Sequence, residues 1–260
     1  MMGKSAMPIA QRLRIAALVT FGLAISTIST QAQETDLPEA EAILDKYIEA
    51  TGGAEAHQKI KTRVTRGTLE VVGAGLKGDV EIYQAAPAKL LSVVEFEGLG
   101  KIVQGTDGKA AWELNPLTGD RVLKDNEKAD FLIAARLDET AWREDYEKVE
   151  CTGVEDVDGK PAYKVVLTPK QGNPATNFYD KDSGLMVKSS RTVETPMGQI
   201  PVEIFISDYQ EVDGLKIPFK STQKVLTQEL KTEAEEISHN VEIGDDRFAI
   251  PDSVKAMLDD

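Results

Sequence analysis

The sequence predicts a mainly β protein (α+β) whose antiparallel sheet of about ten or eleven strands curls on itself. The first observation is a long series of short apolar or alternating segments separated by tight turns, from residue 62 to residue 241. Asp-Gly pairs at 107, 158 and 213 mark hairpins, because glycine accepts the positive φ that a two-residue turn needs. Short turns of this kind join neighbouring antiparallel strands.

The second observation is one unusually apolar helix within this series. Residues 129–137 contain Phe131, Leu132, Ile133, Ala134 and Ala135 in succession, among good helix formers. A helix that is apolar nearly all round must be covered on more than one side. We therefore expect this helix to act as a lid or plug on the sheet.

Composition limits the possible partners. The chain has 260 residues, 30 basic and 44 acidic, for a formal charge of −14. Nucleic-acid binding requires clustered Lys and Arg, so this class of function is not expected. Docking on an anionic lipid surface by charge alone is not expected either.

The N-terminus has the pattern of an export signal. Lys4, Arg12 and Arg14 precede an uncharged, mostly apolar run at residues 15–28, which is short for a membrane span. Small residues before position 33 offer a cleavage site near Ala32, and no cysteine directly follows for a lipid anchor. We expect residues 1–32 to be a signal peptide and the mature protein to be periplasmic; an uncleaved membrane anchor is the alternative.

The elements of the mature chain follow in order. Asp36 and Pro38 predict a helix start, residues 40–50 carry apolar side chains at helical spacing, and Gly52-Gly53 ends the helix. One or two further turns are expected at 54–60. The expected strands are 62–71, 76–83, 90–96, 101–104, 110–112, 147–154, 162–168, 176–180, 186–194, 200–209, 217–226 and 229–241, followed by a short helix over Asp252–Leu258.

Several motifs resemble one family. Asp107-Gly108-Lys109 with Trp112 and Asn115-Pro116 is similar to a hairpin of the periplasmic carriers that sort outer-membrane lipoproteins, the LolA type. The apolar helix, Trp142 before Tyr146, the segment 166–170 and the closing Phe248-Ala249-Ile250-Pro251 are similar too, in the same order over residues 37–255.

The resemblance implies that residues 33–260 form a single LolA-like domain. Its fold would be an incompletely closed antiparallel barrel, with helices forming a lid over an apolar cavity. Carriers of this type hold lipoprotein acyl chains and use no cofactor or metal. The partners it implies are a lipid or an acylated protein, with outer-membrane or envelope proteins as further candidates, and we expect a monomer. The family has a lid-latching Arg before a Pro at the end of the second strand. Here that position is Ala86, so we expect either that the lid closes differently or that the chain carries something other than lipoproteins.

Catalytic patterns are weak. His57 and His239 are the only histidines, there is no G-x-S-x-G motif, and no local spacing suggests a metal site. Asp180 to Gly184 is a turn rather than a calcium loop, since it lacks a distal bidentate Glu. The single cysteine, Cys151, is expected to be a small core residue.

The residues expected to line the ligand cavity are Phe131, Leu132, Ile133, Trp112 and Trp142; ordinary core packing is the alternative for each. The sequence favours a non-catalytic binder of a lipophilic ligand, because acyl chains need mainly apolar walls. A secreted hydrolase on the same scaffold and an envelope assembly protein remain as alternatives.

Overall fold

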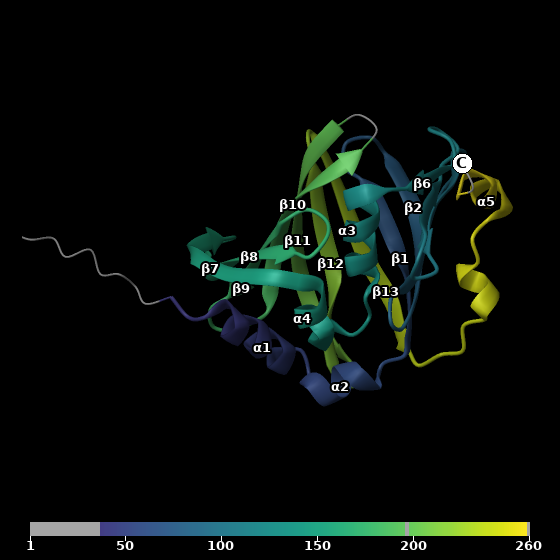
Figure 1. The fold of residues 1–260 in the computed structure, drawn as a ribbon. Coiled ribbons are helices and arrows are strands. Elements are labelled where there is room, and N and C mark those ends of the chain that lie inside the picture. Colours follow the sequence, from purple (N-terminus) through teal and green to yellow (C-terminus); the bar gives the residue numbers. More distant parts are fainter. Residues whose placement is uncertain (1–36, 196–197, 259–260) are drawn as a thin grey trace, which may run out of the picture. The chain divides into compact units, whose positions relative to one another are not determined.

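The computed structural model describes residues 37–195 and 198–258 (Figure 1). The expected signal peptide, residues 1–32, and the expected helix cap Asp36 lie outside the described residues. Within the described part of the chain, no helix is both long and apolar enough to span a bilayer.

Thirteen strands and seven helical segments make up this part of the chain. The strands are β1 (Thr62–Val71), β2 (Leu76–Ala85), β3 (Lys89–Phe96), β4 (Gly100–Thr106), β5 (Ala111–Leu114), β6 (Arg121–Leu123), β7 (Tyr146–Val157), β8 (Lys160–Pro169), β9 (Ala175–Asp180), β10 (Met186–Thr195), β11 (Gly198–Val212), β12 (Leu215–Val225) and β13 (Gln228–His239). The helices are α1 (Ala40–Ala50), α2 (Ala54–Lys59), α3 (Asp125–Ala135), α4 (Trp142–Asp145) and α5 (Asp252–Leu258), with 3₁₀ turns η1 (Glu139–Ala141) and η2 (Asp245–Phe248).

All described strands belong to one antiparallel sheet. The order is β6-β5-β4-β3-β2-β1-β13-β12-β11-β10-β9-β8-β7, so the first strand pairs with the last. The two edge strands, β6 and β7, are consecutive in sequence but do not pair, and the segment with α3 and α4 connects them. The sheet is therefore an incompletely closed barrel, as expected, with α3 lying across its inner side (Figure 1).

The Asp-Gly pairs form the expected turns. Gly108, Gly159 and Gly214 have φ of 93°, 83° and 81°, and Asp158 and Asp213 have φ of 51° and 53°. At 158–159 and 213–214, positive φ at both central residues is the geometry of type I′ hairpin turns, which match the twist of the strands they join.

Helix α1 covers one wing of the sheet. Its buried face is Ala40, Ile43, Leu44 and Ile48, in agreement with the expected spacing. It packs on the side chains of Val165 and Leu167 from β8 and Tyr179 from β9. This packing fixes the helix beside the place where α3 ends.

Some sequence-based boundaries were wrong. Helix α1 begins at Ala40, so Pro38 precedes the helix and does not lie in its first turn. Glu39 is at the N-cap position, and no side chain caps the helix. Helix α3 begins at Asp125, not near Ala129 as the sequence predicts. The prediction misses the first turn because that turn is polar and carries no apolar pattern. Strand β6 was not expected, since three residues between two turns are too few to show an alternation.

The pairing of β1 with β13 depends on a glycine. The register shifts between Arg66 and Gly67, which is a β-bulge. A Cβ atom on Gly67 would overlap the carbonyl oxygen of Glu233 and lie 2.9 Å from Ala234 Cα. Only a residue without a side chain allows the two backbones to approach this closely.

We predict that Gly67→Ala lowers the free energy of unfolding by about 1–3 kcal/mol, since the new methyl group overlaps backbone rather than a flexible side chain. Gly153→Ala is a matched control, because Gly153 also lies in a strand and a Cβ atom added there would have no neighbour within 4 Å. Urea unfolding of both variants measures the difference. Equal stability of the two variants would contradict the prediction.

Candidate functional site

Helix α3 separates two hollows on the inner side of the sheet. The helix contacts β3 and β5 on one wing and β10 on the other. The first cavity lies between α3, α4, α1 and strands β7–β10, and the second hollow lies between α3, β4–β6 and β10. These contacts cover α3 from two wings, but Ala135 is the one residue of the helix that is buried, so the helix is less enclosed than its sequence predicts.

The first cavity has a volume of about 180 Å³. Its walls are mostly apolar and aromatic, with four polar side chains at the margin. The lining residues are Leu44, Tyr47, Ile48, Ile133, Arg136, Glu139, Trp142, Asp145, Tyr146, Leu167, Asn177, Tyr179 and Met186.

Buried phenols are the main polar groups of this cavity. Burial raises the pKa of Tyr146 to about 12, and burial also raises the pKa values of Tyr47, Tyr179 and Tyr209. The nearby Glu139 raises the pKa of Tyr47 further, and the Tyr209 hydroxyl donates to the Met186 carbonyl at 2.9 Å. The phenols therefore stay protonated, and they add hydrogen-bonding groups to the cavity without adding charge.

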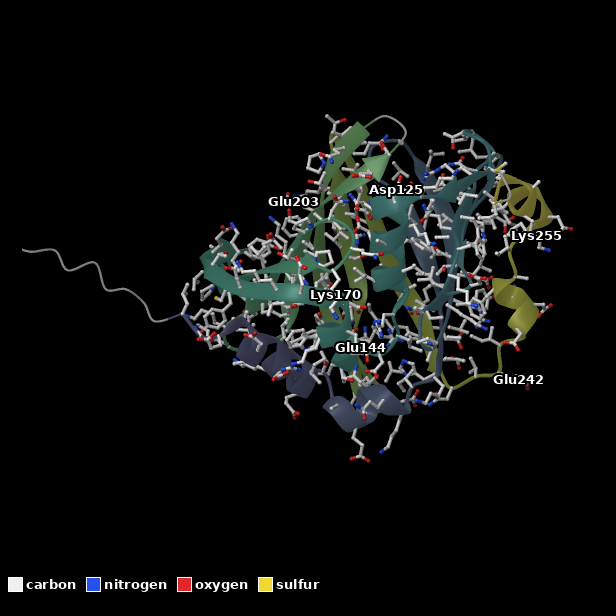
Figure 2. The ribbon with its side chains drawn as sticks, viewed as in Figure 1. Asp125, Glu144, Lys170, Glu203, Glu242 and Lys255 are labelled. Atoms are coloured by element: carbon white, nitrogen blue, oxygen red, sulfur yellow. The ribbon has the colours of Figure 1, made fainter. Side chains whose placement is uncertain are left out.

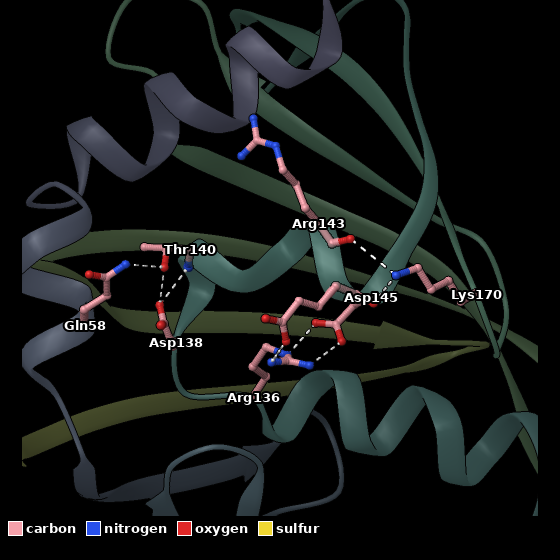
Figure 3. A network of polar contacts seen from close by, with 8 residues as sticks. Gln58, Arg136, Asp138, Thr140, Arg143, Asp145 and Lys170 are labelled. Atoms are coloured by element: carbon pink, nitrogen blue, oxygen red, sulfur yellow. Dashed lines mark hydrogen bonds and ion pairs between the residues drawn. The ribbon is translucent and has the colours of Figure 1, made fainter.

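An arginine ties the end of α3 to α4. Arg136 donates to both carboxylate oxygens of Asp145, with Nε–Oδ2 at 2.6 Å and Nη2–Oδ1 at 2.7 Å (Figure 3). Its Nη1 lies 3.1 Å from Glu144 Oε2. The side chain of Asp145 is only 13% exposed. A bidentate pair of this kind fixes geometry as well as adding energy.

Further contacts hold α3 along its length. Asp130 accepts hydrogen bonds from the backbone and the side chain of Asn173, at 2.8 and 2.9 Å, in the loop between β8 and β9. Asn126 donates to Glu194 at the end of β10, at 3.2 Å. The α4 segment is held in turn by Lys170, whose Nζ donates to the carbonyl of Glu144 in α4 at 2.7 Å. Figure 2 labels both residues.

The structure also shows what lies at the position of the missing latch arginine. Ala86 packs with Leu137, Ile60 and Leu215 in a small apolar cluster. The backbone N–H of Leu137, just after α3, donates to the Pro87 carbonyl at 3.2 Å. At this position the lid is therefore held by an apolar contact and a backbone hydrogen bond, and its side-chain ion pair is made by Arg136 instead.

The second hollow has a volume of about 280 Å³ and is more polar. Glu113 lies on one side, where it accepts from Gln104 at 2.9 Å and Asn115 at 3.1 Å and pairs with Arg121 at 3.0 Å. Arg121 also pairs with Glu127 of α3 at 2.7 Å. Burial alone would raise the pKa of Glu113, but these hydrogen bonds and the arginine lower it overall.

Two buried N–H groups beside α3 lack a partner among the described residues. They are Trp142 Nε1, on the first cavity, and Arg191 Nε, on the second hollow. Arg191 also influences Tyr146 of the first cavity through its charge. Both groups are donors, so an oxygen acceptor on a bound molecule would satisfy them.

The five residues expected to line the cavity are distributed as follows. Ile133 and Trp142 line the first cavity and Phe131 lines the second hollow. Leu132, half-buried, lines neither. Trp112 is fully buried, and its indole lies against Gly105, where a Cβ atom would be 2.6 Å from Trp112 Cζ2. Glu113 lines the second hollow, so the alternation of β5 places Trp112 on the other face.

The histidines are parts of separate hydrogen-bonded clusters. Thr51 Oγ1 donates to the Tyr47 carbonyl at 2.8 Å, so its oxygen accepts from His57 Nε2 at 2.8 Å. His239 accepts from Arg63 Nε at 3.1 Å and faces Asp213 with Nδ1 at 3.1 Å. Burial lowers the pKa of both histidines. His57 thus donates to the threonine, the reverse of what a general base requires.

Cys151 is half-buried beside the α1 core, as a small core residue would be. Burial raises the pKa of its thiol, which disfavours the nucleophilic thiolate.

Sequence reasoning missed most of the polar groups around α3. Tyr47 was predicted as part of an apolar helix face, and Tyr179 and Arg191 were not singled out. They come from α1, β9 and β10, so only the fold brings them to α3. The one available signal was the position of Arg136 at the end of the apolar helix.

The buried phenols predict a loss of stability at alkaline pH. Tyrosines titrate near pH 10 when unfolded, whereas Tyr146 titrates at about 12 in the folded protein. The contribution of Tyr146 to the free energy of unfolding is therefore fully present below pH 10. It falls by about 1.4 kcal/mol per pH unit as pH rises toward 12. We expect Tyr146→Phe to flatten the pH dependence of urea unfolding between pH 10 and 12. An unchanged slope would show that Tyr146 does not contribute.

Searches with the sequence found no relatives: no protein-family model matches it, and no curated protein does. Solved structures do match. A DUF1329-family protein from Desulfovibrio piger superimposes with a TM-score of 0.56 at 14% identity, covering 82% of this chain and 98% of that one.

Two further structures carry the family name that the sequence motifs suggested. A LolA superfamily protein from Nitrosomonas europaea gives a TM-score of 0.56 at 11% identity, over 82% of this chain and 99% of that one. A domain described as an outer membrane lipoprotein-sorting protein, from Vibrio parahaemolyticus, gives 0.53 at 10% identity, over 80% and 97%. The resemblance is confirmed as one of fold: this chain shares its fold with a LolA superfamily structure.

Proposed function

We propose that this chain is an exported, non-catalytic carrier or binder of a lipophilic ligand, either a lipid or the acyl chains of a lipoprotein. The observation that carries the proposal is the mostly apolar cavity under the end of α3, walled by Ile133, Leu44 and Leu167. Apolar walls with a few polar groups at the margin are typical of sites for such ligands.

The cavity volumes indicate that α3 moves when a ligand binds. Pockets for whole ligands usually measure about 300–1,000 Å³. A dry cavity of about 150 Å³ holds only a molecule the size of benzene. At about 180 Å³, the first cavity takes a short part of an acyl chain while α3 stays in place. A longer chain requires α3 to shift toward the second hollow, which measures about 280 Å³.

The donors beside α3 suit the head of such a ligand. Trp142 Nε1, on the first cavity, and Arg191 Nε, on the second hollow, are buried and without partners among the described residues. An ester or acid group bears only acceptor oxygens when ionised or esterified, so it fits these donors. The apolar walls would then bind the acyl chain of the ligand, and the donors would bind its polar head.

The remaining parts of the proposal rest on the sequence and the shared fold. The signal-like segment supports export and a periplasmic location. The fold shared with a protein described as a lipoprotein-sorting domain supports a lipid or acylated protein as ligand. Outer-membrane or envelope proteins are further candidate partners, and the protein would act as a monomer.

We predict that Ile133→Asp weakens binding of an uncharged fluorescent naphthylamine probe at least about tenfold, because a carboxylate in an apolar cavity is costly to desolvate. Val154→Asp adds the same charge on an exposed part of β7 and should bind normally. Fluorescence titration measures both. The proposal fails if wild type shows no saturable binding, and lipid extraction with mass spectrometry of the purified protein provides an independent measure.

We also predict that Arg136→Gln loosens the lid. The substitution leaves the largely buried Asp145 without its partner, which should cost about 1–3 kcal/mol of stability, reduced by the partial exposure of the pair. Hydrogen exchange should speed up in α3 and α4, and probe association should become faster. The double variant with Asp145→Asn tests the pair itself: the two effects should not add. Additive effects would show that the pair does not act as a latch.

A further inference from the structure

The hairpin turns at one end of the sheet carry exposed apolar side chains. Because the strands are antiparallel and in the order given above, the β1–β2, β3–β4, β5–β6 and β12–β13 turns lie at the same end, at the upper ends of the strands in Figure 1. Each of the four turns bears at least one large exposed aliphatic residue in the turn or at its edge. In the order of the turns given above, these residues are Val72 with Leu76, then Leu99, then Leu117, then Leu226.

Adjacent contacts confirm that the turns lie side by side. Val71 pairs with Leu76 and with Leu230, so the β1–β2 turn lies next to the β12–β13 turn. Phe96 pairs with Gly78, which places the β3–β4 turn beside the start of β2. A Cβ atom on Gly100 would lie 3.7 Å from Pro116, which places the β5–β6 turn beside the β3–β4 turn.

These side chains are exposed well beyond what packing requires. Leu226 is 72% exposed, Leu117 is 68% and Leu99 is 39%. Leu226 has a φ of 53°, a backbone conformation that a branched aliphatic residue rarely adopts. Nothing in the fold explains leucine at such a position, where Asn or Gly would be less strained.

The turns at the opposite end have the reverse character. They contain Asp107-Gly108, Asp158-Gly159, Asp182 and Asp213-Gly214. None of the described turns between strands at that end has a large exposed aliphatic residue. Among the described turns between strands, the large exposed aliphatic residues are therefore at one end of the sheet.

We propose that the apolar end, meaning Val72, Leu76, Leu99, Leu117 and Leu226, docks on a lipid bilayer by inserting these side chains among the acyl chains. Separate aliphatic side chains on neighbouring turns do not form a groove for a peptide, but they suit a soft lipid surface that closes around each one. This inference goes beyond the proposed ligand binding, and a protein without any ligand could dock in this way.

The charge of the protein determines which lipids the apolar end is expected to dock on. The chain carries −14 overall, and the basic residues near these turns stand among acidic ones: Lys101, for example, pairs with Glu95 at 3.1 Å. Attraction to anionic lipids is therefore not expected. Docking should be strongest on zwitterionic phosphatidylcholine or phosphatidylethanolamine vesicles and nearly independent of salt.

The position of the apolar end also suits ligand transfer. The second hollow is lined by Arg121, directly after the β5–β6 turn, and by Glu194 and Thr195 at the end of β10. All three lie toward the same end of the sheet. A bilayer at this end would therefore face the hollow beside α3.

The test is flotation of the purified full chain with phosphatidylcholine/phosphatidylethanolamine vesicles. The variant Leu117→Ser/Leu226→Ser should weaken vesicle binding about tenfold or more, because two exposed leucines lose their transfer into lipid. The matched control Val154→Ser/Val241→Ser removes two exposed apolar residues that lie elsewhere and should bind as wild type does. Both variants change only exposed side chains, so their thermal unfolding should stay unchanged.

A second measurement reports insertion directly. In a Cys151→Ser background, a polarity-sensitive fluorophore on Leu226→Cys should shift to the blue when vesicles are added, while the same label on Val154→Cys should not. The proposal is overturned if wild type does not float, if Leu117→Ser/Leu226→Ser floats as well as the control, or if the label at position 226 does not shift. Flotation that occurs only with vesicles carrying envelope proteins would assign this end to a protein partner and also overturn it.

Discussion

The pairing of β1 with β13 determines the rest of the structure. Joining the first strand to the last places every other strand in sequence order on either side of this seam and leaves β6 and β7 as the edges. Those two strands are consecutive in the chain, so the segment between them must cross the open side. That segment contains α3, which lies across the inner side of the sheet and contacts β3 and β5 on one wing and β10 on the other.

The polar contacts of α3 follow from this position. A helix forms no backbone ladder with the strands it crosses, so side chains must hold it. Arg136, Asp130 and Asn126 do so at separate points, each with a partner on a different element. Arg136 also lines the first cavity and Asp130 the second hollow. The side chains that attach α3 and those that line the hollows therefore overlap.

Much of the fold could be predicted from the sequence. Alternating strands and Asp-Gly turns gave the antiparallel sheet, and the apolar stretch around Phe131 gave the lid, because both are local patterns. The pairing of β1 with β13 could not be predicted, since nothing local identifies partners so distant in sequence. The site was predictable only in part. Ile133 and Trp142 line the first cavity, but Tyr47, Tyr179 and Arg191 reach α3 only through the fold. Trp112 resembles a cavity residue in sequence, yet its place is set by close packing on Gly105.

The seam also has a consequence for the order of folding. Hairpins on either side of it can form as soon as their own residues are available, but β1 gains its second neighbour only when the last strand has been made and has arrived. In a chain that emerges from its N-terminus, β1 would wait with one edge unpaired until the last strand has emerged. The bulge at Gly67 interrupts the regular edge that this strand would offer to another chain during that interval.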